Sequence, residues 1–291
     1  MRKIPVWKTV AQGYAFTFGQ LGTIIGLIWL PMVIAAVAGY FVMSQYYSAL
    51  PPAIEEGDPA AAGRAALIVI LWSVISLMLS SIMYTAVTRQ ALGLRHGPAL
   101  ISFHFGASEW RVFGALAALI AILILFLSIY LSAMGLLLKQ TAPGAPPNMG
   151  AGLLALVFLP ALFYAMVRLS FLLIPATVAE GTIGLARSWQ LSGGNFWRIV
   201  LIGIATLAPL FILAGVAEIA ILGTGALVPH NVPAGDADAQ LRELVREMRA
   251  ASPHMPLLYG FSFLIAPLGM GLGLSPAAFA YLALKNGSTT N

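Results

Sequence analysis

Residues 186–198 read A-R-S-W-Q-L-S-G-G-N-F-W-R and lie between two long apolar runs. Gly193 and Gly194 can adopt the left-handed backbone conformation that ends a helix, and Asn195 is a residue type that caps the next one. The remaining side chains include aromatic and basic groups of the kind found at the depth of lipid headgroups. They are Trp189, Phe196, Trp197, Arg187 and Arg198. The stretch predicts an interfacial helix, a tight turn and the start of a transmembrane helix.

The composition of the whole chain places this stretch in a membrane protein. Of its 291 residues, 60% are hydrophobic and 9% are charged, whereas a soluble domain carries about 25% charged residues. Apolar runs long enough to cross a bilayer lie at about 21–43, 65–87, 112–138, 151–176, 199–222 and 256–284. We therefore expect an all-α integral membrane protein, with residues 1–291 forming a single membrane domain of six transmembrane helices.

Two shorter segments have the spacing of amphipathic surface helices. Residues 5–18 place apolar side chains on one face, which predicts an interfacial helix. That face holds Trp7, Val10, Tyr14 and Phe18, and the opposite face holds Lys8, Thr9 and Gln12. Residues 236–250 lie in the longest connection and are predicted to form a helix on the bundle or on the headgroups. Its apolar face holds Leu241, Leu244, Val245 and Met248.

The basic residues predict the orientation of the spans. With the N-terminus in the cytoplasm, the connections at 44–64 and 223–255 are outer loops, and Lys and Arg side chains are more numerous inside than outside. The inner ones are Arg2, Lys3, Lys8, Arg89, Arg95, Arg111, Arg187, Arg198 and Lys285, and the outer ones are Arg64, Lys139, Arg242, Arg246 and Arg249. The positive-inside rule then predicts that both termini are cytoplasmic. We read the basic excess as a signal of orientation and of anionic lipid, and we expect no nucleic-acid binding.

A weak internal repeat is visible in the spacing of three glycines. Gly19, Gly106 and Gly193 lie 87 residues apart, and each precedes an apolar run. Two Trp-Arg pairs share this offset, Trp110-Arg111 and Trp197-Arg198. The spacing is either a coincidence of glycines or a repeated unit. A repeat predicts three helical hairpins around an axis normal to the membrane, with interfacial helices ahead of spans one, three and five.

The pattern R-S-W-x-L-x-x-G-N-x-W-R in residues 187–198, with the lead-in P-A-T-V-A-E-G at 175–181, resembles a bacterial membrane-protein family. This family is the glycerophosphoryl diester phosphodiesterase membrane domain, together with YciC-like multi-pass proteins. The resemblance implies a module of the bacterial inner membrane. Some members carry a catalytic domain after this module. The chain ends shortly after its sixth predicted span, so we expect the module without that domain.

Two charged residues lie within predicted spans, where an unpaired charge is costly. For Arg168 in span four, the alternatives are a clamp for a headgroup phosphate and a structural arginine that reaches the interface or helix-end carbonyls. Glu218 lies about one turn from the outer end of span five. We expect it to pair with Lys139 or with an arginine of 236–250, or to form an ion or proton site. A direct pair between Arg168 and Glu218 is not expected.

The predicted inner surface collects the candidate binding residues. They are Arg95, Arg111, Arg187 and Arg198 with Trp110, Trp189 and Trp197, and Arg168 is added to them from span four. One alternative is general anchoring at the interface. The other is a site for anionic phospholipid headgroups, to which each basic residue near the surface contributes about 1 kcal/mol.

Proline and glycine within the spans predict kinks or close packing. The prolines are Pro31, Pro160, Pro209, Pro267 and Pro276. In span six, Gly269, Gly271 and Gly273 favour close helix packing, with a broken helix that lines a cavity as the alternative. Gly22 and Gly26 form a small face for helix contact in span one.

No motif of a known catalytic class can be assembled from the chain, so we expect no enzyme activity, no cofactor and no metal site. The histidines, His96, His104, His230 and His254, lack ligand spacing. Our leading hypothesis is a non-enzymatic protein that binds or rearranges lipid, or another amphiphile, at the cytoplasmic leaflet. The alternatives are a transporter or channel for a small solute, and a scaffold for a separate enzyme. The sequence does not choose between a protein partner and self-association.

Overall fold

The computed structural model describes residues 3–95, 105–139, 149–223 and 237–285, and every regular element in these ranges is a helix. The helices are α1 (Val6–Gly19), α2 (Leu21–Glu55), α3 (Pro59–Ala91), α4 (Ala107–Lys139), α5 (Met149–Ser170), α6 (Leu173–Glu180), α7 (Leu185–Leu191), α8 (Phe196–Leu222), α9 (Ala237–Ala251), the 3-10 turn η2 (Ser252–His254) and α10 (Met255–Lys285). Six helical segments are long and apolar enough to cross a membrane. The predicted all-α membrane fold with six spans is confirmed.

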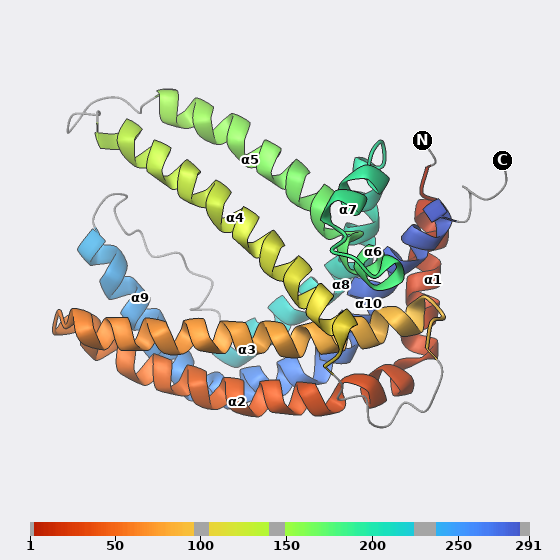
Figure 1. Ribbon diagram of the computed structural model, residues 1–291. Helices are drawn as coiled ribbons and strands as arrows, with labels where there is room; N and C mark the ends of the chain where they lie inside the picture. Colours follow the sequence, from red (N-terminus) through yellow and green to blue (C-terminus); the bar gives the residue numbers. More distant parts are fainter. Residues whose placement is uncertain (1–2, 96–104, 140–148, 224–236, 286–291) are drawn as a thin grey trace.

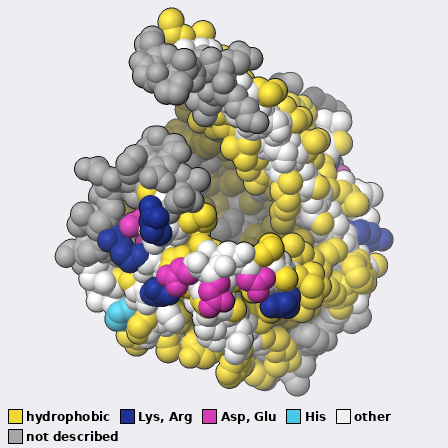
Figure 2. All heavy atoms as spheres, turned by 90° about the vertical axis from the view of Figure 1, so that its left-hand side faces the viewer, with side chains coloured by type: hydrophobic (Ala, Val, Ile, Leu, Met, Phe, Trp, Pro, Cys, Tyr) yellow, Lys and Arg dark blue, Asp and Glu magenta, His cyan; other side chains and the backbone are white. Residues whose placement is uncertain are grey.

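The helices diverge from one end of the molecule toward the other (Figure 1). The described ends of the chain lie together with α1, α6 and α7, and we name this the elbow end. At the opposite end, the α4–α5 hairpin stands apart from α2 and α3, and we name this the open end. Figure 2 looks onto the open end and shows a hollow whose walls are largely hydrophobic.

Two packed cores hold the elbow end together, and α10 contributes to both. One core joins α1, α2, α3 and α10 around the fully buried Ile24 and Ile28. The other joins the N-terminal segment, α1, α6, α8 and α10, and includes Ile4 and Tyr281. By contrast, Ala151 is the only buried residue recorded within α5. Val167, near the end of α5 at the elbow, packs against the second core, whereas the open end of the hairpin stands apart from α2 and α3 (Figure 1).

The connection between α2 and α3 is a tight turn, so the outer loop predicted for residues 44–64 is wrong. Gly57 ends α2 in the left-handed conformation, with φ at 66°. Asp58 then caps α3 by accepting hydrogen bonds from the N–H groups of Ala60 at 2.8 Å and Ala61 at 3.1 Å. The two helices consequently extend well beyond the predicted spans and pair along most of their length.

The fourth span is interrupted, whereas the sequence predicted one continuous run at 151–176. α5 ends at Ser170 and α6 begins at Leu173. Pro175 has no N–H to donate to the carbonyl of Phe171, and its ring crowds that carbonyl. Pro175 was not among the prolines predicted to kink spans, and the five that were lie inside continuous helices. The break turns the chain into α6 and α7 at the elbow end.

α1 crosses α10 through small residues. A Cβ atom added to Gly13 would lie 2.7 Å from the ring of Pro276, and one added to Gly271 would lie 2.5 Å from Thr17. The Ser275 hydroxyl also donates a hydrogen bond to the Gly13 carbonyl at 3.3 Å. Of the two alternatives for the glycines of span six, the structure therefore shows close packing at Gly271.

The buried face of α1 differs from the predicted apolar face. Thr9, which the sequence placed on the polar side, is 1% exposed, while Trp7 and Phe18 are 77% and 59% exposed. The reason is the close crossing, because at Gly13 and Gly271 only small side chains fit between α1 and α10. Trp7 and Phe18 are left on the outer surface of α1, whereas Phe16 is buried against Phe279 of α10.

Tyr14 compensates for a proline in another helix. Pro209 lacks the N–H that would bond the carbonyl of Ala205 within α8. The Tyr14 hydroxyl donates a hydrogen bond to this carbonyl at 2.9 Å. An orphaned carbonyl inside a membrane protein needs such a partner, since the hydrocarbon core supplies no water. This contact ties α1 to α8.

The repeated glycines occupy similar places. Gly19 ends α1 just before α2, Gly106 directly precedes α4, and Gly193 lies in the turn before α8. Separate short helices, α1 and α7, precede the first and fifth spans as predicted. For the third span, α4 begins directly at Ala107 with no separate helix in the described residues, and residues 96–104 lie outside the described ranges.

Replacing single glycines of α10 tests its crossing with α1. We expect Gly271→Ala to lower the melting temperature in detergent, because overpacking costs about 1–3 kcal/mol and exceeds the gain of about 1 kcal/mol in helix propensity. Gly269→Ala and Gly273→Ala are matched controls, since no atom lies within 4 Å of a Cβ added at either position. Equal melting temperatures for all three variants would show that the crossing is not tight.

A double-mutant cycle tests the compensation between Tyr14 and Pro209. We expect Tyr14→Phe to cost about 1–3 kcal/mol of unfolding free energy, because it leaves the Ala205 carbonyl unpaired. In a Pro209→Ala background the alanine N–H can bond that carbonyl, so the cost of Tyr14→Phe should fall. If the losses of unfolding free energy caused by Tyr14→Phe and Pro209→Ala were additive in chemical unfolding, the contact would be contradicted.

Candidate functional site

The elbow, residues 185–198, comprises α7 and the turn into α8, and Arg168 of α5 lies against it. The Arg168 guanidinium donates hydrogen bonds to the Trp189 carbonyl at 2.5 Å, to the Ser192 hydroxyl at 3.2 Å and to the Tyr164 hydroxyl at 3.0 Å. It also lies 3.9 Å from the centre of the Trp189 ring. Arg168 thus satisfies a carbonyl at the end of α7 and makes a cation–π contact. This geometry favours the structural alternative for Arg168.

Two serines, Ser188 of α7 and Ser192 at its C-cap, bond back to the backbone of Arg168. The Ser188 and Ser192 hydroxyls donate hydrogen bonds to the Arg168 carbonyl at 2.9 and 3.1 Å, and both residues are fully buried. This carbonyl belongs to the last turn of α5, where the helix break leaves it without a helical partner. Side chains at the ends of α5 and α7 therefore supply the hydrogen bonds that each other's terminal carbonyls lack.

Asn195 and Arg198 hold the N-terminal segment. The Asn195 side-chain oxygen accepts a hydrogen bond from the Ile4 N–H at 2.9 Å, and Arg198 donates one to the Ile4 carbonyl at 2.6 Å. Asn195 stands at the N-cap position of α8, but its side chain makes no capping hydrogen bond. The predicted capping role of this side chain is wrong, because the amide oxygen is committed to the buried Ile4.

The turn between α6 and α7 is built on two glycines. Gly181 takes the left-handed conformation at φ 66°. A Cβ added to Gly184 would lie 2.9 Å from the Thr177 backbone nitrogen, so only glycine fits there. Gly194 is the left-handed residue of the predicted glycine pair at the elbow.

Arg187 and Arg111 meet at this turn. Arg187 forms an ion pair with Glu180 at 2.9 Å, and Tyr281 donates a hydrogen bond to the same carboxylate oxygen at 2.9 Å. The Arg187 side chain remains 43% exposed. Arg111 is exposed, and its Nη1 would lie 3.5 Å from a Cβ added to Gly181, the residue after Glu180. The structure therefore brings two exposed guanidinium groups to one surface.

An aromatic cluster lies next to Arg111 at the start of α4. Trp110 makes edge contacts with Phe105, at a ring-centre distance of 4.7 Å, and with Phe113, at 5.6 Å. Ile183 of the α6–α7 turn covers Gly114, where an added Cβ would lie 3.7 Å from its side chain. We name Arg111, Arg187 and this aromatic cluster the α4–α6 surface.

Tryptophans are exposed over the elbow end. Trp110 is 53%, Trp197 72% and Trp189 38% exposed. Trp189 is the least exposed of the three because one face of its ring covers Arg168. Trp197 contacts Phe196, which in turn packs on Tyr164. Trp189 therefore lies against Arg168, whereas Trp110 precedes Arg111 in α4 and Trp197 lies on α8.

A second basic group lies where α3 ends and α4 begins. Glu109 is 5% exposed, pairs with Arg89 at 3.6 Å and accepts a hydrogen bond from the Gly106 N–H at 2.9 Å. This last contact is one half of a capping box. Burial lowers the pKa of Arg95 from its ordinary value, and the charge of Arg89 adds to the effect. An arginine remains protonated despite such a shift.

Glu218 lies apart from these residues, on the exposed surface of α8 near its last turn. Among the described α9 arginines, Arg246 pairs with Glu243 and Arg249 with Glu55. The side chain of Lys139, the other predicted partner, lies outside the described residues. As predicted, Arg168 and Glu218 belong to opposite ends of the bundle.

Sequence reasoning missed the partners that the elbow uses. They are Ile4, Tyr164, Glu180, Ser188, Ser192 and Tyr281. The one local signal was the i, i+4 spacing of the two serines within an otherwise amphipathic helix. Within the described ranges, no three His, Asp or Glu side chains gather in a group that could hold a metal ion. His96, His104 and His230 lie outside these ranges.

None of the family models, curated proteins or solved structures compared with the chain matches it. The resemblance of residues 175–198 to the phosphodiesterase membrane domain therefore stays a prediction.

A charge-conserving change tests the role of Arg168. We expect Arg168→Lys to lower the unfolding free energy by about 1–3 kcal/mol, because lysine keeps the charge but cannot make three directed hydrogen bonds. Thermal unfolding in detergent is the measurement, with Arg64→Lys at the exposed start of α3 as the control. A Lys variant as stable as the parent protein would show that Arg168 acts only through its charge.

Proposed function

We propose that the protein is a non-enzymatic integral membrane protein that binds or rearranges an anionic phospholipid at the cytoplasmic leaflet. The observation that carries the proposal is the α4–α6 surface, where two exposed arginines lie beside exposed aromatic side chains. Arg111 and Arg187 are the headgroup ligands, because they are the predicted arginines whose guanidinium groups reach the surface. Arg168 and Arg198 hold this surface in place through their contacts with Trp189 and Ile4.

The chemistry of the surface suits a phosphate diester. At the α6–α7 turn, Arg111 of α4 and Arg187 of α7 lie beside the single carboxylate of Glu180, which leaves a positive charge for an anion. An exposed ion pair contributes less than about 1 kcal/mol, so a phosphate oxygen can share the Arg187 donors at little cost. Trp110 and Phe113 offer apolar area to the glycerol and upper acyl groups.

The exposed tryptophans set the depth of the elbow end. Trp7 of α1 and Trp197 of α8 lie on different helices and are both more than 70% exposed. Indole rings collect at the boundary between hydrocarbon and headgroups. With these rings at that boundary, the arginines of the α4–α6 surface lie at phosphate level.

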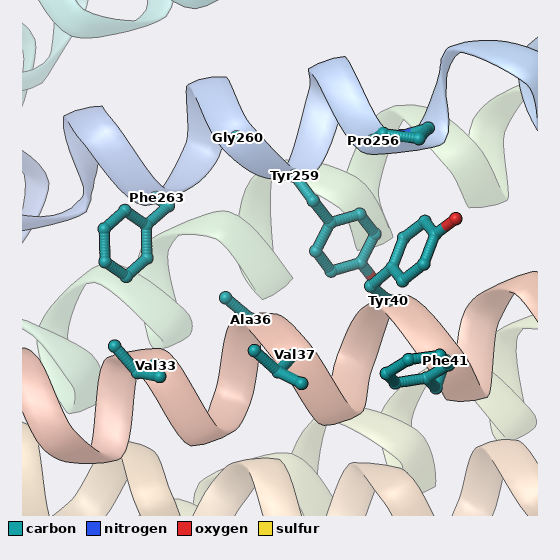
Figure 3. A pocket seen from close by; sticks show the side chains of 9 residues that line it. All are labelled: Val33, Ala36, Val37, Tyr40, Phe41, Pro256, Tyr259, Gly260 and Phe263. Atoms are coloured by element: carbon teal, nitrogen blue, oxygen red, sulfur yellow. The ribbon is translucent and has the colours of Figure 1, made fainter.

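Apolar surfaces between the spans favour an amphiphile over a polar solute. A groove of about 480 Å³ separates α2 from α10, where the small residues Ala36 and Gly260 leave a gap (Figure 3). Val33 and Phe263 line one end of it, and Tyr40 lies at the other. A second groove, between α8 and α10, is also lined by apolar residues. Such walls match acyl chains and offer few partners to a hydrophilic solute.

The orientation and location follow from the charges. The described ends of the chain lie together at the elbow end (Figure 1). The predicted inner segments, which carry the excess of Lys and Arg, also meet there. By the positive-inside rule the elbow end faces the cytoplasm, and we assign the protein to the bacterial inner membrane on the resemblance of its elbow motif.

Native mass spectrometry with lipid identification tests the proposal. We expect the parent protein, released from mild detergent, to retain an anionic phospholipid class, and Arg111→Gln to lose most of it. At about 1 kcal/mol per surface arginine, the affinity should fall roughly fivefold.

Lys8→Gln is the matched control, because Lys8 is an exposed cation of α1 at the same end. The proposal is contradicted if the parent, Arg111→Gln and Lys8→Gln retain equal amounts of anionic lipid, or if only the bulk lipid mixture is retained. These arginines would then serve only to anchor the protein at the interface.

A further inference from the structure

A basic cleft lies at the open end, far from the elbow. It has a volume of about 530 Å³ between the last turn of α2 and one face of α9. Its lining residues are Ile54, Glu55, Leu241, Arg242, Val245, Arg246 and Arg249. The arginines recur at i, i+4 and i+7, so the helix presents them on one side. Three guanidinium groups therefore face a single carboxylate among the residues that form the cleft.

The arginines are not what docks α9 onto the bundle. Val245 and Met248 are 4% and 5% exposed and supply the buried contact. Arg246 pairs with Glu243 within its own helix, and Arg249 pairs with Glu55 of α2. The Arg246 and Arg249 side chains remain 52% and 58% exposed. Exposed pairs of this kind are weak, so an incoming anion can take over their donors.

The cleft borders the apolar hollow of the open end, between the α4–α5 hairpin and the paired helices α2 and α3. In Figure 2 the basic and acidic side chains of the open end lie side by side along one rim of the hollow, whose walls are hydrophobic. Leu241 and Leu244 of α9 are each 43% exposed. A charged rim beside an apolar hollow matches a molecule with an anionic head and a long apolar tail.

The length of α2 places the cleft near the second membrane surface. Its 35 residues extend about 52 Å at 1.5 Å per residue, compared with about 40–45 Å for a bilayer including its headgroups. A helix that starts at one interface therefore ends at, or just beyond, the opposite headgroups. Glu55 is the last residue of α2, so the arginines around it lie within reach of lipid phosphates.

We propose that the cleft between α2 and α9 binds the phosphate headgroup of an anionic phospholipid of the outer leaflet, with its acyl chains in the hollow between the hairpins. Arg242 and Arg246 bind the phosphate, and Arg249 joins them when its pair with Glu55 opens. This site is distinct from the α4–α6 surface, which lies at the other end of the bundle. Its assignment to the outer leaflet rests on the orientation given with the proposed function, whereas its binding chemistry does not.

The test compares three variants of the full chain in native mass spectrometry and in nanodiscs. The probes are phosphatidylglycerol, phosphatidylcholine and inorganic phosphate. Arg242→Gln/Arg246→Gln should weaken phosphatidylglycerol binding roughly 30-fold, since two surface arginines contribute about 1 kcal/mol each. Glu55→Gln should strengthen it, because it frees Arg249. Arg64→Gln, an exposed cation at the same end that does not line the cleft, should leave binding unchanged.

The same series in an Arg111→Gln background separates the two sites. The losses of phosphatidylglycerol binding at the two sites are expected to be additive, because the sites lie at opposite ends of the bundle. The outer site is overturned if Arg242→Gln/Arg246→Gln removes no lipid, or if Glu55→Gln weakens binding as loss of a docking contact would do. Equal binding of phosphatidylcholine would also overturn it, because it would show no preference for an anionic headgroup. Retention of inorganic phosphate that phosphatidylglycerol does not displace would overturn it by showing a site for a soluble anion.

Discussion

Side chains at the end of α5 and at the end of α7 donate hydrogen bonds to each other's terminal backbone carbonyls. The arrangement of the elbow end depends on these hydrogen bonds. Arg168 donates to a carbonyl of α7, while Ser188 and Ser192 donate to the Arg168 carbonyl. Polar groups left unpaired near the hydrocarbon cost several kcal/mol, so a span can break here only if its free ends find partners. The break lets the chain turn into α6 and α7, which in turn places Arg187 beside Arg111. The arginine inside the span therefore shapes the surface on which the proposed function rests.

Close packing supplies the second constraint, and it explains the open shape. Gly13, Thr17 and Gly271 let α1 lie directly on α10, and the two cores that follow are both at the elbow end. Among the described residues, the α4–α5 hairpin shows no comparable close crossing with α10, and it stands apart from α2 and α3 at the open end (Figure 1). The resulting hollow has largely hydrophobic walls, and α9, whose three arginines line one cleft, lies at the same end of the molecule. Both proposed lipid sites follow from this asymmetry between a packed end and an open end.

Much of this architecture was readable from the sequence, because a transmembrane span is a local property of composition. The spans, the short helices α1 and α7 and the amphipathic α9 all follow from hydrophobic periodicity. The turn at Gly57-Asp58 was missed, because the span limits followed the apolar runs and left residues 44–64 as a loop. The partners of the elbow could not be read, since Asn195 meets Ile4 across 191 residues of chain. The buried face of α1 was missed for a similar reason, because it depends on where Gly271 lies in space.

The central claim is that a lipid phosphate is held at Arg111 beside the aromatic cluster of α4. The most direct measurement is photocrosslinking in nanodiscs with phosphatidylglycerol that carries a diazirine on its acyl chain, followed by mapping of the adducts. The account predicts adducts concentrated on Phe105, Trp110 and Phe113, the side chains that contact one another next to Arg111. It also predicts that Arg111→Gln removes them while adducts elsewhere persist. Adducts spread evenly over the exposed apolar faces of all spans, unchanged in the variant, would show only the surrounding bilayer and would contradict the claim.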